Sequence, residues 1–130
     1  MKQINFYRNE KGRCYVEEFL DSLNGKQAQK VVWVLRLIEE LDTVPSQYLR
    51  KLVNTDDIWE VRVLFSGNIF RLLGFFEESS TLMLTNGFIK KSQKTPADEI
   101  KVAEQRKQDF LERRTLDERS KSIHNEADND

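Results

Sequence analysis

Three consecutive segments between residues 58 and 89 have strand-like patterns, with only short polar turns between them. Apolar residues fill the odd positions from Trp59 to Phe65, while Glu60 and Arg62 fall on the other side, as in a half-buried strand. Segments 69–76 and 81–89 are also rich in β-branched and aromatic residues. The polar turns at 66–68 and 77–80 are short enough for hairpins. These residues therefore predict a three-stranded antiparallel meander.

The residues before and after this meander predict helices. Apolar residues at 16, 19, 20 and 23, and again at 31, 34, 35, 38 and 41, follow helical spacing, and Asn24-Gly25 separates the two runs. Residues 3–7 form a short strand-like segment at the start of the chain. Thr95-Pro96-Ala97-Asp98 predicts the start of a last helix with Thr95 as its cap. The apolar stripe of that helix is Ile100, Ala103, Phe110 and Leu111.

These segments predict an α+β fold with a C-terminal helix. An N-terminal helical hairpin packs on a small, mainly antiparallel sheet in the order β-α-α-β-β-β, because amphipathic helices must bury their apolar stripes. A chain of 130 residues is one domain by length. We assign that domain to residues 1–114. Residues 115–130 carry two basic and five acidic side chains, and we expect them to form a charged, disordered tail.

Composition excludes several kinds of chemistry. With one cysteine and one histidine, the chain has no internal disulfide, no Cys/His zinc set and no Ser-His-Asp triad outside the tail. We therefore expect no metal and no cofactor. No apolar run approaches the roughly 18 to 20 residues of a membrane span, so the expected location is the cytoplasm, with no membrane partner.

Two arginines are the first candidates for a binding site. Arg71 interrupts an otherwise apolar strand, and Arg62 occupies the polar side of the neighbouring strand, so the hairpin places both on one sheet face. Adjacent guanidiniums favour an intervening anion, and arginine suits phosphate. The alternative is that Glu60 and acidic residues of the helices neutralise both arginines.

A run of lysines is the second candidate. Lys90, Lys91 and Lys94 lie where the last strand ends and the last helix begins, and Lys51 lies just before the meander. A helix N-terminus beside a cationic loop favours phosphate. The alternative is an ordinary solvated surface. Phe88 is a candidate for stacking on a base, or is a core residue.

Four motifs together resemble the phage-derived, HigB-like branch of the RelE toxin superfamily. They are Trp59-Glu60-Val61-Arg62, Gly67-Asn68-Ile69-Phe70-Arg71, Asn86-Gly87-Phe88-Ile89-Lys90-Lys91, and Lys94-Thr95-Pro96 followed by Glu99-Ile100. The resemblance covers roughly residues 4–114. It implies a RelE-like fold and the toxin of a type II toxin-antitoxin pair that cleaves mRNA, generally on the ribosome. It also implies a helix-turn-helix antitoxin, HigA-like, through which alone the toxin meets operator DNA.

The implied reaction is attack of a ribose 2′-hydroxyl on the adjacent phosphorus, without a metal. Arg62 and Arg71 would bind the phosphate, and Lys90 or Lys91 would supply charge or the acid. A lysine crowded by cations has a lowered pKa, so one of Lys51, Lys90, Lys91 and Lys94 would be the base. Lys51, Phe88 and Lys94 would also contact RNA. Two alternatives are a catalytically inactive, toxin-like protein-binding module and a non-catalytic nucleic-acid-binding domain, the latter disfavoured by the lack of a broad basic face.

Overall fold

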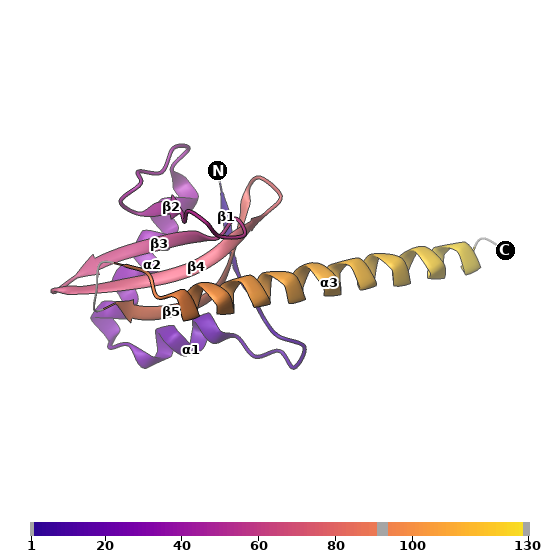
Figure 1. The fold of residues 1–130 in the computed structure, drawn as a ribbon, viewed down its shortest axis with the longest axis horizontal. Coiled ribbons are helices and arrows are strands. Elements are labelled where there is room, and N and C mark those ends of the chain that lie inside the picture. Colours follow the sequence, from indigo (N-terminus) through magenta and orange to yellow (C-terminus); the bar gives the residue numbers. More distant parts are fainter. Residues whose placement is uncertain (1, 91–93, 129–130) are drawn as a thin grey trace.

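The computed structural model describes residues 2–90 and 94–128 and contains one five-stranded mixed sheet (Figure 1). Its strand order is β1-β5-β4-β3-β2. The strands are β1 (Gln3–Phe6), β2 (Leu49–Lys51), β3 (Trp59–Phe65), β4 (Asn68–Glu77) and β5 (Thr81–Lys90). All neighbours are antiparallel except β1, which runs parallel to β5. The predicted meander and the α+β class are confirmed, and β2 is a strand that the predicted order lacked.

Two helices cover one face of this sheet. They are α1 (Tyr15–Ser22) and α2 (Gly25–Glu40). Val16 of α1 and Ile38 of α2 are fully buried in one apolar cluster with Val61 and Leu72 of the sheet. Asn24 does more than end the first helix, because its side chain and that of Gln27 form a capping box that starts α2.

The third helix, α3 (Ala97–Asp128), crosses the opposite face and continues beyond the sheet (Figure 1). Of its predicted apolar stripe, Ile100, Ala103 and Phe110 pack on sheet clusters, whereas Leu111 is 40% exposed. The predicted cap is wrong. The Pro96 carbonyl accepts the first helical hydrogen bond, from the Ile100 amide, and the Thr95 hydroxyl donates to Glu60 instead.

The segment expected to be a disordered tail continues this helix as far as Asp128. Between Thr115 and Lys121 every residue is exposed, so this part of the helix has no core to pack on. The segment contains no glycine or proline, and Arg114 pairs with Glu118 one turn later at 3.3 Å. Such local pairs support an exposed helix. None of the helices in residues 2–90 and 94–128 combines the length and apolar character that crossing a bilayer requires.

A β-bulge bends β5 where it passes Gly74 of β4. Leu73 pairs with Asn86 but Gly74 pairs with Leu84, which leaves Thr85 as the extra residue. A Cβ at Gly74 would lie 2.2 Å from the Met83 carbonyl oxygen, a backbone atom. The sheet therefore requires glycine here, because any side chain collides with the next strand.

We expect Gly74→Ala to lower the free energy of unfolding by about 1–3 kcal/mol, the usual range for overpacking. Denaturant titration measures the change. Gly25→Ala is the matched control, because nothing lies within 4 Å of its added methyl group and the residue begins a helix. Equal stability of Gly74→Ala and Gly25→Ala would contradict the bulge geometry.

Candidate functional site

The hairpin of β3 and β4 places Arg62 and Arg71 side by side. The two residues are direct partners in the antiparallel register, as the alternation predicts. On the other side of β3, Arg50 of β2 is the partner of Glu60. Antiparallel partners project to the same face, so these side chains share the sheet face that α3 covers only in part. We call Arg50, Glu60, Arg62, Arg71 and Lys90 the cationic cluster.

Glu60 is the centre of this cluster and is completely buried. Its Oε1 accepts hydrogen bonds from Nη1 of Arg71 and from Nε of Arg50, the latter at 3.2 Å. Its Oε2 accepts from the hydroxyl of Thr95, which precedes α3. One carboxylate thus joins β2, β3, β4 and the start of α3. The alternative that Glu60 neutralises both arginines therefore holds for Arg71. Glu60 forms no ion pair with Arg62 among the described residues.

Two guanidinium nitrogens in the cluster have no hydrogen-bond partner in the part of the chain that the structure describes. They are Nε of Arg62 and Nε of Arg71, and both are buried donors without an acceptor among the described residues. Native proteins satisfy nearly all such groups, so two unsatisfied donors on paired residues indicate an acceptor from outside the described residues. Two adjacent guanidinium groups bind an anion more readily than any other acceptor.

Lys90 lies beside the arginines at the end of β5. Its register partner is Ile69, two residues before Arg71, and it is 5% exposed. Burial lowers the pKa of Lys90, and the positive charges of Arg71, Arg50 and Arg62 lower it further, with Glu60 acting in the opposite direction. Burial is also the main reason that the pKa of Arg71 is lowered. Lys90 is therefore more readily deprotonated than an ordinary lysine.

Two of the other predicted residues, Lys51 and Phe88, do not belong to this cluster. Lys51 follows Arg50 in β2, and its Nζ pairs with Asp57 at 2.7 Å rather than with a member of the cluster. Phe88 is the register partner of Arg71, but it packs on the apolar cluster that contains Leu73. Lys94 is exposed, just before Thr95. Lys91 lies outside the described residues.

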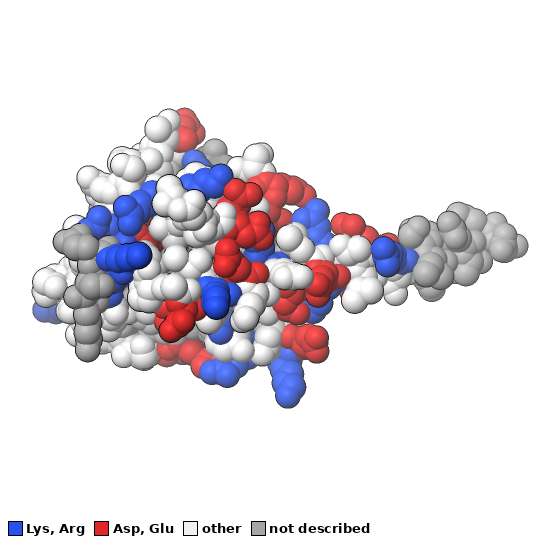
Figure 2. Space-filling view, in the orientation of Figure 1, with Lys and Arg blue, Asp and Glu red and all other residues white. Residues whose placement is uncertain are grey.

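Sequence reasoning missed Arg50 and Thr95 as members of this arrangement. Arg50 supplies the cation that was expected from Lys51, because β2 pairs in the register that sets Arg50 opposite Glu60. The alternation of a three-residue strand is too short to reveal which side chain faces which side. Figure 2 shows Lys and Arg side chains over the end of the sheet where α3 begins, whereas acidic side chains are frequent further along α3.

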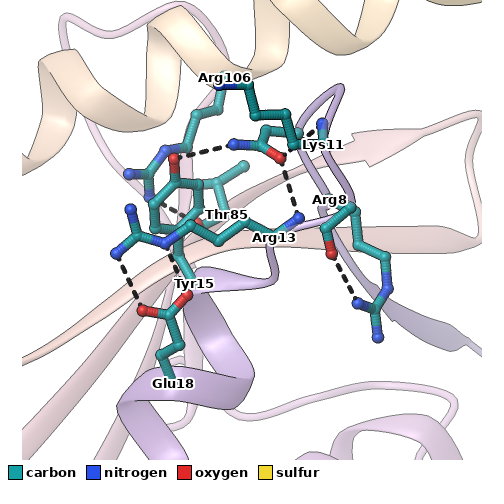
Figure 3. A network of polar contacts seen from close by, with 9 residues as sticks. Arg8, Lys11, Arg13, Tyr15, Glu18, Thr85 and Arg106 are labelled. Carbon is teal, nitrogen blue, oxygen red and sulfur yellow. Dashed lines mark hydrogen bonds and ion pairs between the residues drawn. The ribbon is translucent and has the colours of Figure 1, made fainter.

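A second polar network ties α3 to the N-terminal part of the chain (Figure 3). The guanidinium of Arg106 lies 3.6 Å from the centre of the Tyr15 ring, and that of Arg13 lies 4.5 Å from it. Arg106 also donates to the Thr85 carbonyl at 2.8 Å, and Arg13 forms a bidentate pair with Glu18. These cations are already engaged in the fold, so the network fixes α3 on the sheet and leaves the cationic cluster as the candidate site.

A family model described as "Phage derived protein Gp49-like (DUF891)" matches residues 18–108, well over half of the chain. The chain belongs to this family. The Gp49-like family is RelE-like and toxin-like, so the protein is related to toxin-antitoxin systems and an antitoxin is its implied partner. The match contains every residue of the cationic cluster and ends within α3. No curated protein matches the chain.

Proposed function

We propose that this Gp49-like protein is the toxin of a type II toxin-antitoxin pair, in the HigB-like branch, and an endoribonuclease that cuts mRNA on the ribosome in the cytoplasm. A helix-turn-helix antitoxin of the HigA type would neutralise it and carry it to operator DNA. One observation supports the activity above all: Arg62 and Arg71 are direct partners in the sheet register, and each has a buried Nε without an acceptor among the described residues. Lys90, whose pKa their charges help to lower, lies close to them.

The proposed reaction needs charge stabilisation and proton transfer but no metal. The 2′-oxygen of the ribose forms a bond to phosphorus while the bond from phosphorus to the 5′-oxygen breaks. The proton of the 2′-hydroxyl goes to a base, and an acid protonates the leaving 5′-oxygen. The products are a 2′,3′-cyclic phosphate and a 5′-hydroxyl. Cations fixed near the phosphoryl oxygens lower the barrier because negative charge accumulates there.

Three members of the cluster have a direct role in this proposal. Arg62 is partly exposed and contacts the scissile phosphate. Arg71, which is 99% buried through its pair with Glu60, contributes positive potential from beneath and positions the carboxylate. Lys90 takes the proton from the 2′-hydroxyl, because its lowered pKa makes the neutral amine accessible. The ribosome would align the RNA, which can supply several kcal/mol of barrier lowering.

The test is the Arg62→Ala variant under induced expression. Removal of one fixed charge donor is expected to slow cleavage about 100-fold or more and so abolish growth arrest. The fold should remain, because Arg62 forms no ion pair among the described residues and its loss removes an orphaned donor. Translation rate and melting temperature are measured together.

Lys51→Ala is the matched control, since Lys51 is a basic strand residue that pairs with Asp57 and not with the cationic cluster. It should retain full growth arrest. If wild-type protein leaves growth unaffected but binds the product of the adjacent gene, the chain is an inactive binding module. If both variants arrest growth equally, Arg62 has no part in the activity.

A further inference from the structure

Arg50 belongs to the cationic cluster, but the reaction described above gives it no role. It lies on β2, an edge strand of the sheet, directly opposite Glu60 of β3 (Figure 1). The side chain of Arg50 is 44% exposed, whereas those of Arg71 and Glu60 are 1% and 0% exposed. Arg50 therefore reaches the surface of the cluster, and Arg71 does not.

One carboxylate oxygen fixes the guanidinium of Arg50. Oε1 of Glu60 accepts hydrogen bonds from Nη1 of Arg71 and from Nε of Arg50, so the two guanidiniums meet at the same atom. The Nη atoms of Arg50 donate no hydrogen bond within residues 2–90 and 94–128. An exposed arginine held at Nε presents its remaining N–H groups in a rigid plane, and that geometry suits a phosphate.

The positive charge of the cluster exceeds what one phosphate neutralises. Four cations and one carboxylate give the five residues a formal charge of +3, or +2 when Lys90 is the neutral amine. A phosphodiester carries a single negative charge. Burial and Arg71 lower the pKa of Lys90 most, and the charge of Arg50 adds to them, so Arg50 acts on the same site. Cations of one sign held together in this way attract a further anion.

Arg50 and Arg62 are placed to bind adjacent groups of one ligand. The register partner of Arg50 is Glu60, and Arg62 follows Glu60 by two positions on the same face of β3. Such diagonal neighbours on adjacent strands lie about 7–8 Å apart, within reach of each other's long side chains. A single-stranded RNA offers successive phosphates along one backbone, whereas a mononucleotide does not.

We propose that Arg50 binds a second phosphate of the RNA, next to the scissile phosphate that Arg62 contacts. The assignment rests on the proposed function, because the ligand is the same RNA strand. The site then spans at least two consecutive phosphates. A phosphate that does not react is bound equally in the ground state and the transition state, so Arg50 contributes to KM and not to kcat.

The salt dependence of RNA binding counts phosphate contacts. The full chain is titrated with a single-stranded RNA of 2′-O-methyl riboses, which lacks the attacking hydroxyl, over a range of salt concentrations. Each contact with a single strand contributes about 0.7 to the slope of log K against log salt. Arg50→Ala should lower the slope by about 0.7 and weaken binding about tenfold at low salt, whatever the RNA sequence. On ribosome-bound messages KM should rise while kcat stays unchanged.

Three variants separate the charge of Arg50 from its other effects. Lys51→Ala is the matched control, because it removes the same charge one residue later from a side chain that pairs with Asp57, and it should keep the wild-type slope. Arg50→Lys keeps the charge and should also keep the slope. Arg50→Gln can still donate a hydrogen bond to Glu60 but has no charge, so it should lose the slope as Arg50→Ala does.

An Arg50→Ala slope equal to that of Lys51→Ala would overturn the assignment. So would a wild-type chain that does not bind the RNA at low salt, or an Arg50→Ala variant that lowers kcat alone. Arg62→Ala distinguishes this failure from failure of the proposed function. If Arg62→Ala loses slope and cleavage while Arg50→Ala loses neither, the nuclease site stands and Arg50 only pairs with Glu60. If neither variant changes the slope, the phosphate contact of Arg62 fails as well.

Discussion

Arg71→Ala is expected to lower the free energy of unfolding by about 3–5 kcal/mol, the range for removing one partner of a buried ion pair. Arg71 is 1% exposed and Glu60 is completely inaccessible to solvent. Without Arg71, the hydrogen bonds that the described residues still give the buried carboxylate of Glu60 come from Arg50, at 3.2 Å, and from the hydroxyl of Thr95. An incompletely compensated charge inside the protein is the physical cause of the loss.

Denaturant titration of the variant gives this free energy. Arg8→Ala is the control, because Arg8 pairs with Glu17 at 2.8 Å while both side chains are about half exposed, and such pairs contribute about 0–1 kcal/mol. Replacing both buried partners, as in Glu60→Leu/Arg71→Met, should recover most of the stability, since the unpaired charge is then gone. If Arg71→Ala is no less stable than Arg8→Ala, Glu60 and Arg71 do not hold the sheet and α3 together.

Arg71→Ala is a poor probe of activity, because Arg71 forms a buried pair with Glu60. Any loss of activity in this variant combines lost charge with lost stability. Arg62 is the cleaner probe of activity, since it lies in the same register pair without an ion-pair partner among the described residues.

Lys90→Met is expected to slow RNA cleavage about 100-fold to 10,000-fold, the usual contribution of a positioned acid or base. The pKa of Lys90 is lowered, first by burial and then by Arg71. Because the neutral amine is the active form of a base, the wild-type rate should rise with pH and level off below the ordinary lysine value of 10.5. The Lys90→Met rate should lack this rise.

Lys90→Arg separates proton transfer from charge. A guanidinium keeps the positive charge but does not deprotonate at these pH values, so a base role predicts that Lys90→Arg is as inactive as Lys90→Met. Rates are compared at equal folded fraction, measured by thermal melting. Retained activity in Lys90→Arg would assign Lys90 a purely electrostatic role, and a wild-type rate independent of pH would remove it as the base.

The local patterns were sufficient to predict most of the fold. Alternation in β3, followed by a turn too short for any other connection, predicts both the antiparallel pairing and the neighbouring positions of Arg62 and Arg71, and the register confirms them. The apolar spacing of α1 and α2 likewise predicts the helices that cover one sheet face. These features depend on residues close together in sequence, where periodicity is informative.

The remaining features depend on contacts between distant segments. β2 has three residues and exists because it pairs with β3, so its alternation could not show that Arg50 rather than Lys51 faces Glu60. Thr95 has the local pattern of a helix cap, but its hydroxyl donates a hydrogen bond to the buried carboxylate of Glu60, 35 residues earlier. The continuation of α3 through residues 115–128 also runs against composition, which favours disorder in so polar a segment.

The chemistry of RNA ends after induction tests the central proposal most directly. If the cationic cluster directs attack by the 2′-hydroxyl, messages in cells that express the wild-type protein acquire new 5′-hydroxyl ends, each matched by an upstream 2′,3′-cyclic phosphate. The same ends should be missing with Arg62→Ala and present with Lys51→Ala. New ends that carry a 5′-phosphate, or messages that stay intact while growth stops, would contradict the proposal.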